Sequence, residues 1–161
     1  NVIIKADAVM EMDSDLQHDP SDVKRLVAEL DNGFDYILGS RFIPGGTIPK
    51  DWGFKRKFLS IIGNLVFRVA FLNFQIHDFT TGFRLGRVKN FLDKIDFERV
   101  FVKSYAYKEL LLCQMIDLGA KIKEIPIEFS NREKGWSKMD SEDFFESLKV
   151  ILIVWKKKLL S

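Results

Sequence analysis

The sequence predicts an α/β fold with a largely parallel sheet. Short apolar runs typical of buried strands alternate along the 161 residues with stretches whose apolar residues recur at helical spacing. Alternation of this kind favours helices packed against a parallel sheet. At this length, with 47% hydrophobic residues, one globular core is expected. The predicted strands lie at 7–12, at 35–41, at the end of 77–87 and at 121–129, and the predicted helices at 20–30, 54–74, 104–119 and 141–160.

The first predicted helix has the clearest boundaries. Asp19 is suited to cap this helix with Pro20 at its first position, and Asp22 complements the helix dipole. Gly33 follows the expected end of the helix. In the last predicted strand Pro126 has no amide hydrogen to donate, so we expect this strand at an edge or an end of the sheet.

Charge and composition exclude several classes of protein. The 25 Lys and Arg residues nearly balance the 23 Asp and Glu residues, which leaves a formal net charge of +2. Because this charge gives no general attraction for nucleic acid, we expect no nucleic-acid partner. The lone Cys113 cannot form an internal disulfide, and it suits a reducing compartment. The longest apolar run, residues 150–155, is far shorter than the roughly 18 residues that span a bilayer.

Charged and polar residues follow the first two predicted strands. Asp13 and Asp15 come after the first strand, and Ser40 and Arg41 end the second. Open α/β sheets bind their ligands outside the carboxyl ends of the strands. The spacing of Asp13 and Asp15 lets both carboxylates face one point on an extended backbone, which suits Mg²⁺ or Mn²⁺. The alternative is polar turn chemistry before a helix, although Asp19 already serves as the cap.

Four segments occur in an order that resembles a known family. They read MDSDLQHDP, GSRFIPGG, DFTTGFR and KIKEIPIEFSNREKGWSKM. Together, over about residues 6–140, they resemble the polyprenol-phosphate (dolichol-phosphate) mannosyltransferases and their glucosyl relatives among the family 2 glycosyltransferases, which have the GT-A fold. The resemblance implies a metal-dependent enzyme that transfers mannose or glucose, with inversion, from GDP-mannose or UDP-glucose to a polyprenyl phosphate.

The resemblance also assigns roles to individual residues. The metal ligands, for Mg²⁺ or Mn²⁺, are Asp13, Asp15 and Gln17. The residues that hold the acceptor phosphate are Arg41, Arg56 and Ser60. The residues at the donor diphosphate are Asp13, Arg132 and Lys138, the last two in an R-x-x-G-x-S-K loop. Asp15, Arg132 and Lys138 are the residues expected to act directly in catalysis.

Physical arguments support the acceptor site. Arg56 and Ser60 are four residues apart in a predicted helix and so share a face, which Asn64 continues one turn later. The planar guanidinium of arginine matches the geometry of phosphate oxygens. The alternative is that Lys55 to Lys57 are a solvated helix start. For Arg132 and Lys138 the alternative is a solvated loop.

A phosphate acceptor makes a general base unnecessary. A phosphate monoester has its second pKa near 6, so it is mostly a nucleophilic dianion at neutral pH. If the acceptor were a hydroxyl, Asp78 in DFTTGF is the carboxylate placed to act as a catalytic base, and the alternative is that it anchors the turn. His18 and His77 flank the motifs and are expected to be hydrogen-bonded loop residues.

The sequence departs from the family pattern in two places. Relatives carry a Glu in the helix before the E-I-P segment, but counting back from Glu124 places Leu110 there, with Glu109 one residue away. The first strands of the family, which carry the nucleotide-base contacts, are missing. We therefore expect residues 1–139 to be the C-terminal portion of a GT-A domain and 140–161 an amphipathic helix. We expect this chain alone to transfer no sugar, and either to self-associate through an uncovered sheet edge or to need its missing half supplied.

A membrane surface is the partner that the acceptor lipid implies. Residues 54–74 and the terminal helix combine apolar residues with Lys and Arg, as helices at a membrane interface do. We expect a peripheral protein on the cytoplasmic face of a membrane, although 54–74 is also suited to pack on the sheet. Two other classes stay open, a non-catalytic remnant that binds lipid phosphate or membrane, and a nucleotidyltransferase-like protein.

Overall fold

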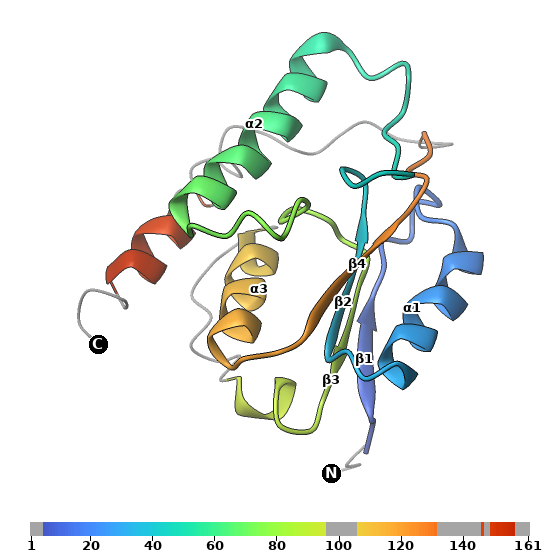
Figure 1. Ribbon diagram of the computed structural model, residues 1–161. Coiled ribbons are helices and arrows are strands. Elements are labelled where there is room, and N and C mark those ends of the chain that lie inside the picture. Colours follow the sequence, from blue (N-terminus) through green and yellow to red (C-terminus); the bar gives the residue numbers. More distant parts are fainter. Residues whose placement is uncertain (1–4, 96–105, 132–145, 147–148, 157–161) are drawn as a thin grey trace.

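The protein is built on a four-stranded sheet with helices on both faces. The computed structural model describes residues 5–95, 106–131, 146 and 149–156. The strands are β1 (Ala8–Glu11), β2 (Tyr36–Ser40), β3 (Arg84–Arg87) and β4 (Ile122–Pro126), and their order in the sheet is β1-β3-β2-β4. Strands β2 and β4 pair in parallel, whereas β3 runs antiparallel to both β1 and β2 (Figure 1). The described sheet is therefore mixed, and the prediction of a largely parallel sheet is wrong at β3.

The direction of β3 follows from the loop that precedes it. Asp78 in that loop binds Arg41, which comes directly after β2, so the loop lies at the carboxyl end of β2. A strand that starts beside the carboxyl end of β2 must run back toward the amino end of β2. In this position β3 fills the space between β1 and β2, which both point the other way. Apolar periodicity predicts that a strand exists, but its direction depends on this long-range contact.

The predicted edge strand and the predicted helix cap are both confirmed. Strand β4, which ends at Pro126, forms one edge of the described sheet, and β1 forms the other. Asp19 accepts a hydrogen bond from the amide of Ser21 at the start of a short 3-10 helix, Pro20–Asp22, which continues into α1 (Val23–Asp31). Gly33, just after α1, has a φ of +89°, a conformation that favours glycine.

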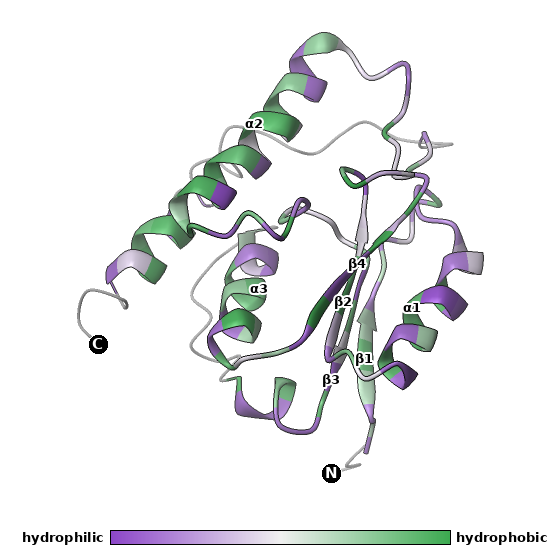
Figure 2. Ribbon diagram, viewed as in Figure 1, coloured by the Kyte–Doolittle hydropathy of each residue, from purple (hydrophilic) through white to green (hydrophobic). Residues whose placement is uncertain are grey.

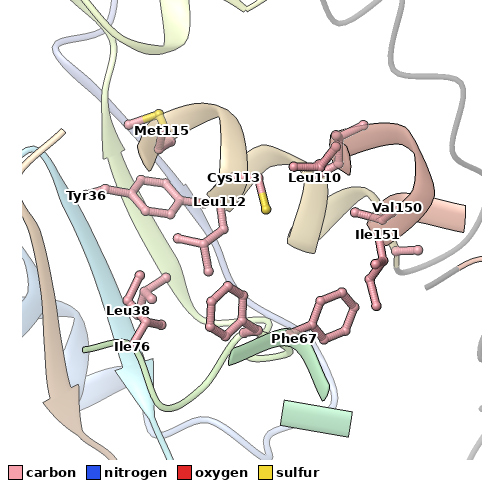
Figure 3. Close-up of a cluster of buried hydrophobic side chains, with 13 residues drawn as sticks. Tyr36, Leu38, Phe67, Ile76, Leu110, Leu112, Cys113, Met115, Val150 and Ile151 are labelled. Carbon is pink, nitrogen blue, oxygen red and sulfur yellow. The ribbon is translucent and has the colours of Figure 1, made fainter. Parts of the chain in front are cut away.

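Two apolar clusters fix the helices to opposite faces of the sheet. Successive side chains of β2 point to opposite faces, so Ile37 packs with Leu26 of α1. On the other face Tyr36 and Leu38 meet Leu112 of α3 (Tyr107–Asp117), as Figure 3 shows. Part of the predicted terminal helix, a helical stretch at 149–156, joins this second cluster through Val150, Ile151 and Val154.

The longest described helix, α2 (Phe54–Ala70), leaves much apolar surface exposed. It contacts the core through Ala70 and through Phe67, which stacks on Phe79 with ring centroids 5.8 Å apart. Phe54, 84% exposed, begins the helix, and Leu72, 79% exposed, follows it. Figure 2 shows α2 as a mostly hydrophobic helix with few polar segments. Among the described residues no helix combines the length and the apolar character needed to cross a membrane.

A buried arginine joins the sheet to the loop before β3. The guanidinium of Arg84 donates to the carbonyl oxygens of Thr81 and Phe79, at 2.6 Å each, and to that of Lys108 in α3. A charge this deeply buried is tolerated because its donors meet acceptors in three directions. Arg84 therefore fixes the position of α3 relative to the loop.

Replacing Arg84 with lysine should destabilise the protein by roughly 2 to 4 kcal/mol, because an ammonium cannot reach three separate carbonyls in the directions of a planar fork. Urea unfolding followed by circular dichroism measures this change. Arg25→Lys is the matched control, since the Arg25 side chain is 49% exposed and should cost far less. Equal losses for the two variants would contradict the anchoring role of Arg84.

Candidate active site

Polar segments from three parts of the chain meet at the carboxyl ends of β1 and β2. Asp13 and Asp15 follow β1, and Arg41 follows β2, as the sequence predicts. The loop before β3 returns to the same edge and brings Asp78 to Arg41 and Gly82 to Asp13. The structure therefore gathers residues from segments far apart in the sequence at one edge of the sheet.

Arg41 and Asp78 form a buried, bidentate ion pair. Arg41 donates from Nε to Oδ2 of Asp78 at 2.8 Å, from its terminal nitrogen to Oδ1 at 2.7 Å, and from its backbone amide to Oδ2 at 3.0 Å. Burial alone would raise the pKa of Asp78, but the guanidinium holds this pKa below its ordinary value. A carboxylate held in its charged form is a weak proton acceptor, so the geometry favours Asp78 as the anchor of its turn.

Glu124 of β4 fixes the start of the same loop. Its Oε1 accepts from the amide of Asp78, and its Oε2 accepts from the amide of His77, both at 2.9 Å. The imidazole Nδ1 of His77 lies 2.9 Å from the same Oε2. Sequence reasoning gave Glu124 no role, although an acidic residue within an apolar strand was a signal that it has a polar partner. His77 is a hydrogen-bonded loop residue, as expected.

The D-x-D-x-Q segment forms a strained turn. Leu16 has a φ of +60°, which is rare for a residue with a branched side chain and is found at functional turns. The amide of Gln17 donates to Oδ1 of Asp15 at 3.2 Å, and Asp13 lies at the end of β1 with its side chain 38% exposed. The segment therefore holds its two carboxylates at the rim of the sheet.

Gln17 ties this turn to the end of the segment after β4. Its side-chain Nε2 donates to the carbonyl oxygen of Ser130 at 2.8 Å, and the amide of Ser130 donates to the carbonyl oxygen of Gln17 at 2.9 Å. Beside it, the buried His18 ring packs between Phe83 and Phe129, with centroids 5.1 and 5.0 Å away. Burial lowers the pKa of His18, so its ring is neutral at neutral pH and packs the loop.

The two carboxylates fit a hard divalent ion. No cluster of three or more His, Cys, Asp or Glu side chains suited to a metal occurs in the described ranges. The predicted donors here are the carboxylates of Asp13 and Asp15 and the side-chain oxygen of Gln17. Magnesium and manganese ions are commonly held by one or two carboxylates, with water and substrate phosphates completing the shell. The chemistry of the donor set thus fits Mg²⁺ or Mn²⁺ bound together with a phosphate ligand.

The predicted acceptor residues line the neighbouring part of the rim. The guanidinium of Arg56 stacks on the ring of Trp52, 3.8 Å from its centroid, and this ring meets Phe129 edge-on at 5.9 Å. The guanidinium of Arg41 lies 5.3 Å from the centroid of the same Phe129. Two cations from different elements therefore border one aromatic cluster.

Thr80 connects Arg41 to the predicted Ser60 and Asn64 face of α2. Its hydroxyl oxygen accepts from Arg41 at 2.8 Å and from Nδ2 of Asn64 at 3.3 Å. Nδ2 of Asn64 also donates to the carbonyl oxygen of Ser60 at 3.0 Å, and its Oδ1 accepts from the amide of Phe79 at 2.7 Å. The Asn64 side of α2 therefore faces the ion pair. The other predicted donor residues, Arg132 and Lys138, lie outside the described residues.

The sequence also matches a known family. The sequence pattern of glycosyl transferase family 2 matches residues 3–93. The chain belongs to glycosyl transferase family 2. This assignment removes the nucleotidyltransferase alternative.

Within this family the chain is similar to polyprenyl-phosphate mannosyltransferases. It is 38% identical over 140 residues to the polyprenol monophosphomannose synthase of Mycolicibacterium smegmatis, covering 87% of this chain and 52% of that protein. It is 35% identical over 133 residues to the undecaprenyl-phosphate mannosyltransferase of Micrococcus luteus, with 83% and 53% covered. The dolichol-phosphate mannosyltransferase of Pyrococcus furiosus is 32% identical over 153 residues, with 93% and 42% covered. The chain thus spans about half the length of these relatives.

Solved structures confirm the fold class. The GT-A enzyme glucosyl-3-phosphoglycerate synthase from Mycobacterium tuberculosis, in complex with phosphoglyceric acid, gives a TM-score of 0.58 at 14% identity, over 92% of this chain and 50% of that one. The same enzyme in complex with Mn²⁺ and UDP-glucose gives 0.57 at 16% identity, over 92% and 48%. At these identities the likeness concerns the fold alone.

This family 2 chain also buries charges that sequence reasoning did not assign. Lys108 in the first turn of α3 places its Nζ 3.2 Å from Oε1 of Glu11 and 3.5 Å from Oδ1 of Asp13. The hydroxyl of Tyr107 donates to the same Oε1 of Glu11. Gly82 makes room for this cluster, because an added Cβ would lie 2.5 Å from Oδ2 of Asp13. The adjacent Lys108 and Glu109 in an otherwise apolar helix were the sequence signal for these buried charges.

Glu109 and its neighbour Leu110 in α3 lie in different surroundings. Leu110, which occupies the family slot by counting, lies in the apolar cluster of Figure 3. Glu109 is buried instead among charges that include Arg84 and Lys108, and its Oε2 has no hydrogen-bond partner among the described residues. Burial raises the pKa of Glu109 from 4.5 to about 7.

The raised pKa of Glu109 should make stability depend on pH. An acid whose pKa rises on folding binds more protons in the folded state, so the free energy of unfolding falls as the pH rises from 4.5 to about 7 and then levels. Glu109→Gln cannot ionise and should remove this fall, which is on the order of 3 kcal/mol. Urea unfolding at pH 5 and pH 8 measures the change. The exposed Asp117→Asn is the control and should keep the wild-type dependence, whereas an unchanged dependence in Glu109→Gln would contradict the assignment.

Proposed function

We propose that a protein containing this chain is an inverting glycosyltransferase that moves a hexose, mannose or glucose, from a nucleotide diphosphate sugar to a polyprenyl phosphate. The observation that supports it most is the shared rim. Two carboxylates suited to a metal and a diphosphate lie beside two guanidiniums that border one aromatic cluster. This arrangement supports a donor site next to an acceptor site.

The donor would bind at the D-x-D side. Asp13 and Asp15 would hold Mg²⁺ or Mn²⁺, which when bound supplies positive charge for the departing nucleoside diphosphate. Arg132 and Lys138, as the resemblance implies, would hold the diphosphate oxygens. The structure of a fold neighbour with Mn²⁺ and UDP-glucose is consistent with this cofactor and donor class. GDP-mannose and UDP-glucose are the donors we propose.

The acceptor would bind at the arginine side. A phosphate monoester dianion attacks the anomeric carbon, a new carbon–oxygen bond forms, and the bond to the donor diphosphate breaks, so the nucleoside diphosphate leaves. The proximity of the substrates and fixed positive charge suffice for this step, and Asp78 then serves by holding Arg41. Arg41, which Asp78 holds, and Arg56, which stacks on Trp52, would both contact the acceptor phosphate.

The acceptor lipid also suggests how the protein meets a membrane. The exposed apolar residues of α2 and its neighbours would enter the interface, with Lys55, Arg56 and Arg68 toward anionic headgroups. We propose a peripheral protein on the cytoplasmic face of a membrane. The free edge of the described sheet at β1 would let residues 1–161 alone self-associate.

A transfer assay tests the function. The protein, prepared at the length of its relatives and as residues 1–161, is incubated with radiolabelled GDP-mannose or UDP-glucose, polyprenyl phosphate and Mn²⁺. The longer protein should label the lipid and lose this activity in Asp15→Asn and in EDTA, while residues 1–161 alone should not. Lipid-phosphate binding without transfer by the longer protein would favour the non-catalytic alternative, and full activity in EDTA would contradict the metal role.

In the same assay Arg56→Ala should raise the KM for polyprenyl phosphate by roughly tenfold or more, because a charge-assisted contact to phosphate is worth about 1.5 to 3 kcal/mol. The KM for the nucleotide sugar should change little. Lys55→Ala, one residue earlier and exposed, is the control for charge alone. A raised donor KM with an unchanged acceptor KM would move Arg56 to the donor site.

A further inference from the structure

We propose that Lys108 is a built-in counter-cation of the D-x-D site, which positions Asp13 and keeps the affinity for a divalent ion low until a nucleoside diphosphate is present. The inference rests on the proposed metal role of Asp13 and Asp15. It concerns a residue outside the motifs that suggested the function.

The position of Lys108 is the first support. Its residue is only 4% exposed, yet its ammonium lies within ion-pair distance of both Glu11 and Asp13. The backbone carbonyl of Lys108 accepts from the buried guanidinium of Arg84, so the start of α3 is fixed in place. The ammonium is therefore held at the carboxylates by the fold.

The space around the ammonium is the second support. Position 82 is a glycine, and an added Cβ there would lie 2.8 Å from Nζ of Lys108 and 2.5 Å from Oδ2 of Asp13. Any side chain at this position would push the carboxylate and the ammonium away. The loop before β3 thus leaves room for Asp13 and Lys108 to approach each other.

Electrostatics then give the consequence for ion binding. A divalent ion at Asp13 and Asp15 would meet a like charge that is shielded from solvent, so its binding is weakened. A nucleoside diphosphate brings negative charge that attracts both the ion and the ammonium of Lys108, and so offsets their mutual repulsion. Ion and nucleotide should therefore bind cooperatively, and by linkage each should raise the affinity for the other by the same factor.

The test is the affinity for Mn²⁺, measured by calorimetry and electron paramagnetic resonance on the full-length protein without and with GDP or UDP. Lys108→Met should bind Mn²⁺ about tenfold or more tightly without nucleotide, the order expected when a like charge is removed at ion-pair distance. The same variant should lose part of the cooperativity between ion and nucleotide. Lys123→Met removes the same charge from β4, at the opposite edge of the described sheet, and should leave Mn²⁺ affinity unchanged.

A second variant keeps the test decisive if Lys108→Met does not fold. Glu11→Gln retains Lys108 and an oxygen acceptor for Tyr107 but removes one compensating carboxylate, so Mn²⁺ should bind several-fold more weakly. A merely structural lysine predicts no such opposite pair of effects. Unchanged Mn²⁺ affinity in Glu11→Gln, or unchanged or weaker affinity in a folded Lys108→Met, would overturn the inference.

The two proposals fail in different ways. If the wild-type protein and Lys108→Met bind no Mn²⁺ even with nucleotide, the metal role of Asp13 and Asp15 is wrong, and this inference falls with it. If Mn²⁺ binds and supports sugar transfer but its affinity is the same in the wild type and in Lys108→Met, only the role of Lys108 is overturned.

Discussion

The buried ion pair between Arg41 and Asp78 is the interaction on which the arrangement of the site depends. It fixes the loop before β3 at the carboxyl end of β2, and it thereby sets the direction of β3. Two charges removed from water are costly unless their hydrogen bonds are satisfied, and here Thr80 and the backbone amide of Arg41 complete them. Replacing one partner would leave the other as an unpaired buried charge, so the loop keeps its position only while the ion pair is intact.

Around this pair, hydrogen bonds hold the two sides of the proposed site, the D-x-D turn and the arginine side. Gln17 connects the D-x-D turn to Ser130, at the end of the segment after β4, by two hydrogen bonds. Thr80 connects Arg41 to Asn64 on α2. Polar contacts between loops thus hold the proposed donor and acceptor sides in place, as the proposed transfer between two phosphate-bearing substrates would require.

The sequence predicts the parts of this structure that depend on local pattern. The strands, the cap at Asp19, the edge position of β4 and the placing of Asp13 and Arg41 at one edge all follow from periodicity, proline chemistry and the geometry of α/β sheets. The direction of β3 and the burial of Lys108 and Glu109 do not. They depend on contacts between residues far apart in the chain. The adjacent Lys and Glu in an otherwise apolar helix signal buried charges, but they do not say which partners those charges meet.

The central claim is that a divalent ion and a nucleoside diphosphate bind together at the end of β1, beside the Arg41 and Asp78 pair. Paramagnetic broadening of amide signals by substoichiometric Mn²⁺, with and without GDP or UDP, tests it most directly on isotope-labelled protein. We expect the amides of Asp13, Asp15 and Gly82 to lose intensity first, more strongly with nucleotide, while those of Asp117 and Gly119 at the far end of α3 persist. Broadening centred elsewhere, or equal at all these amides, would contradict it.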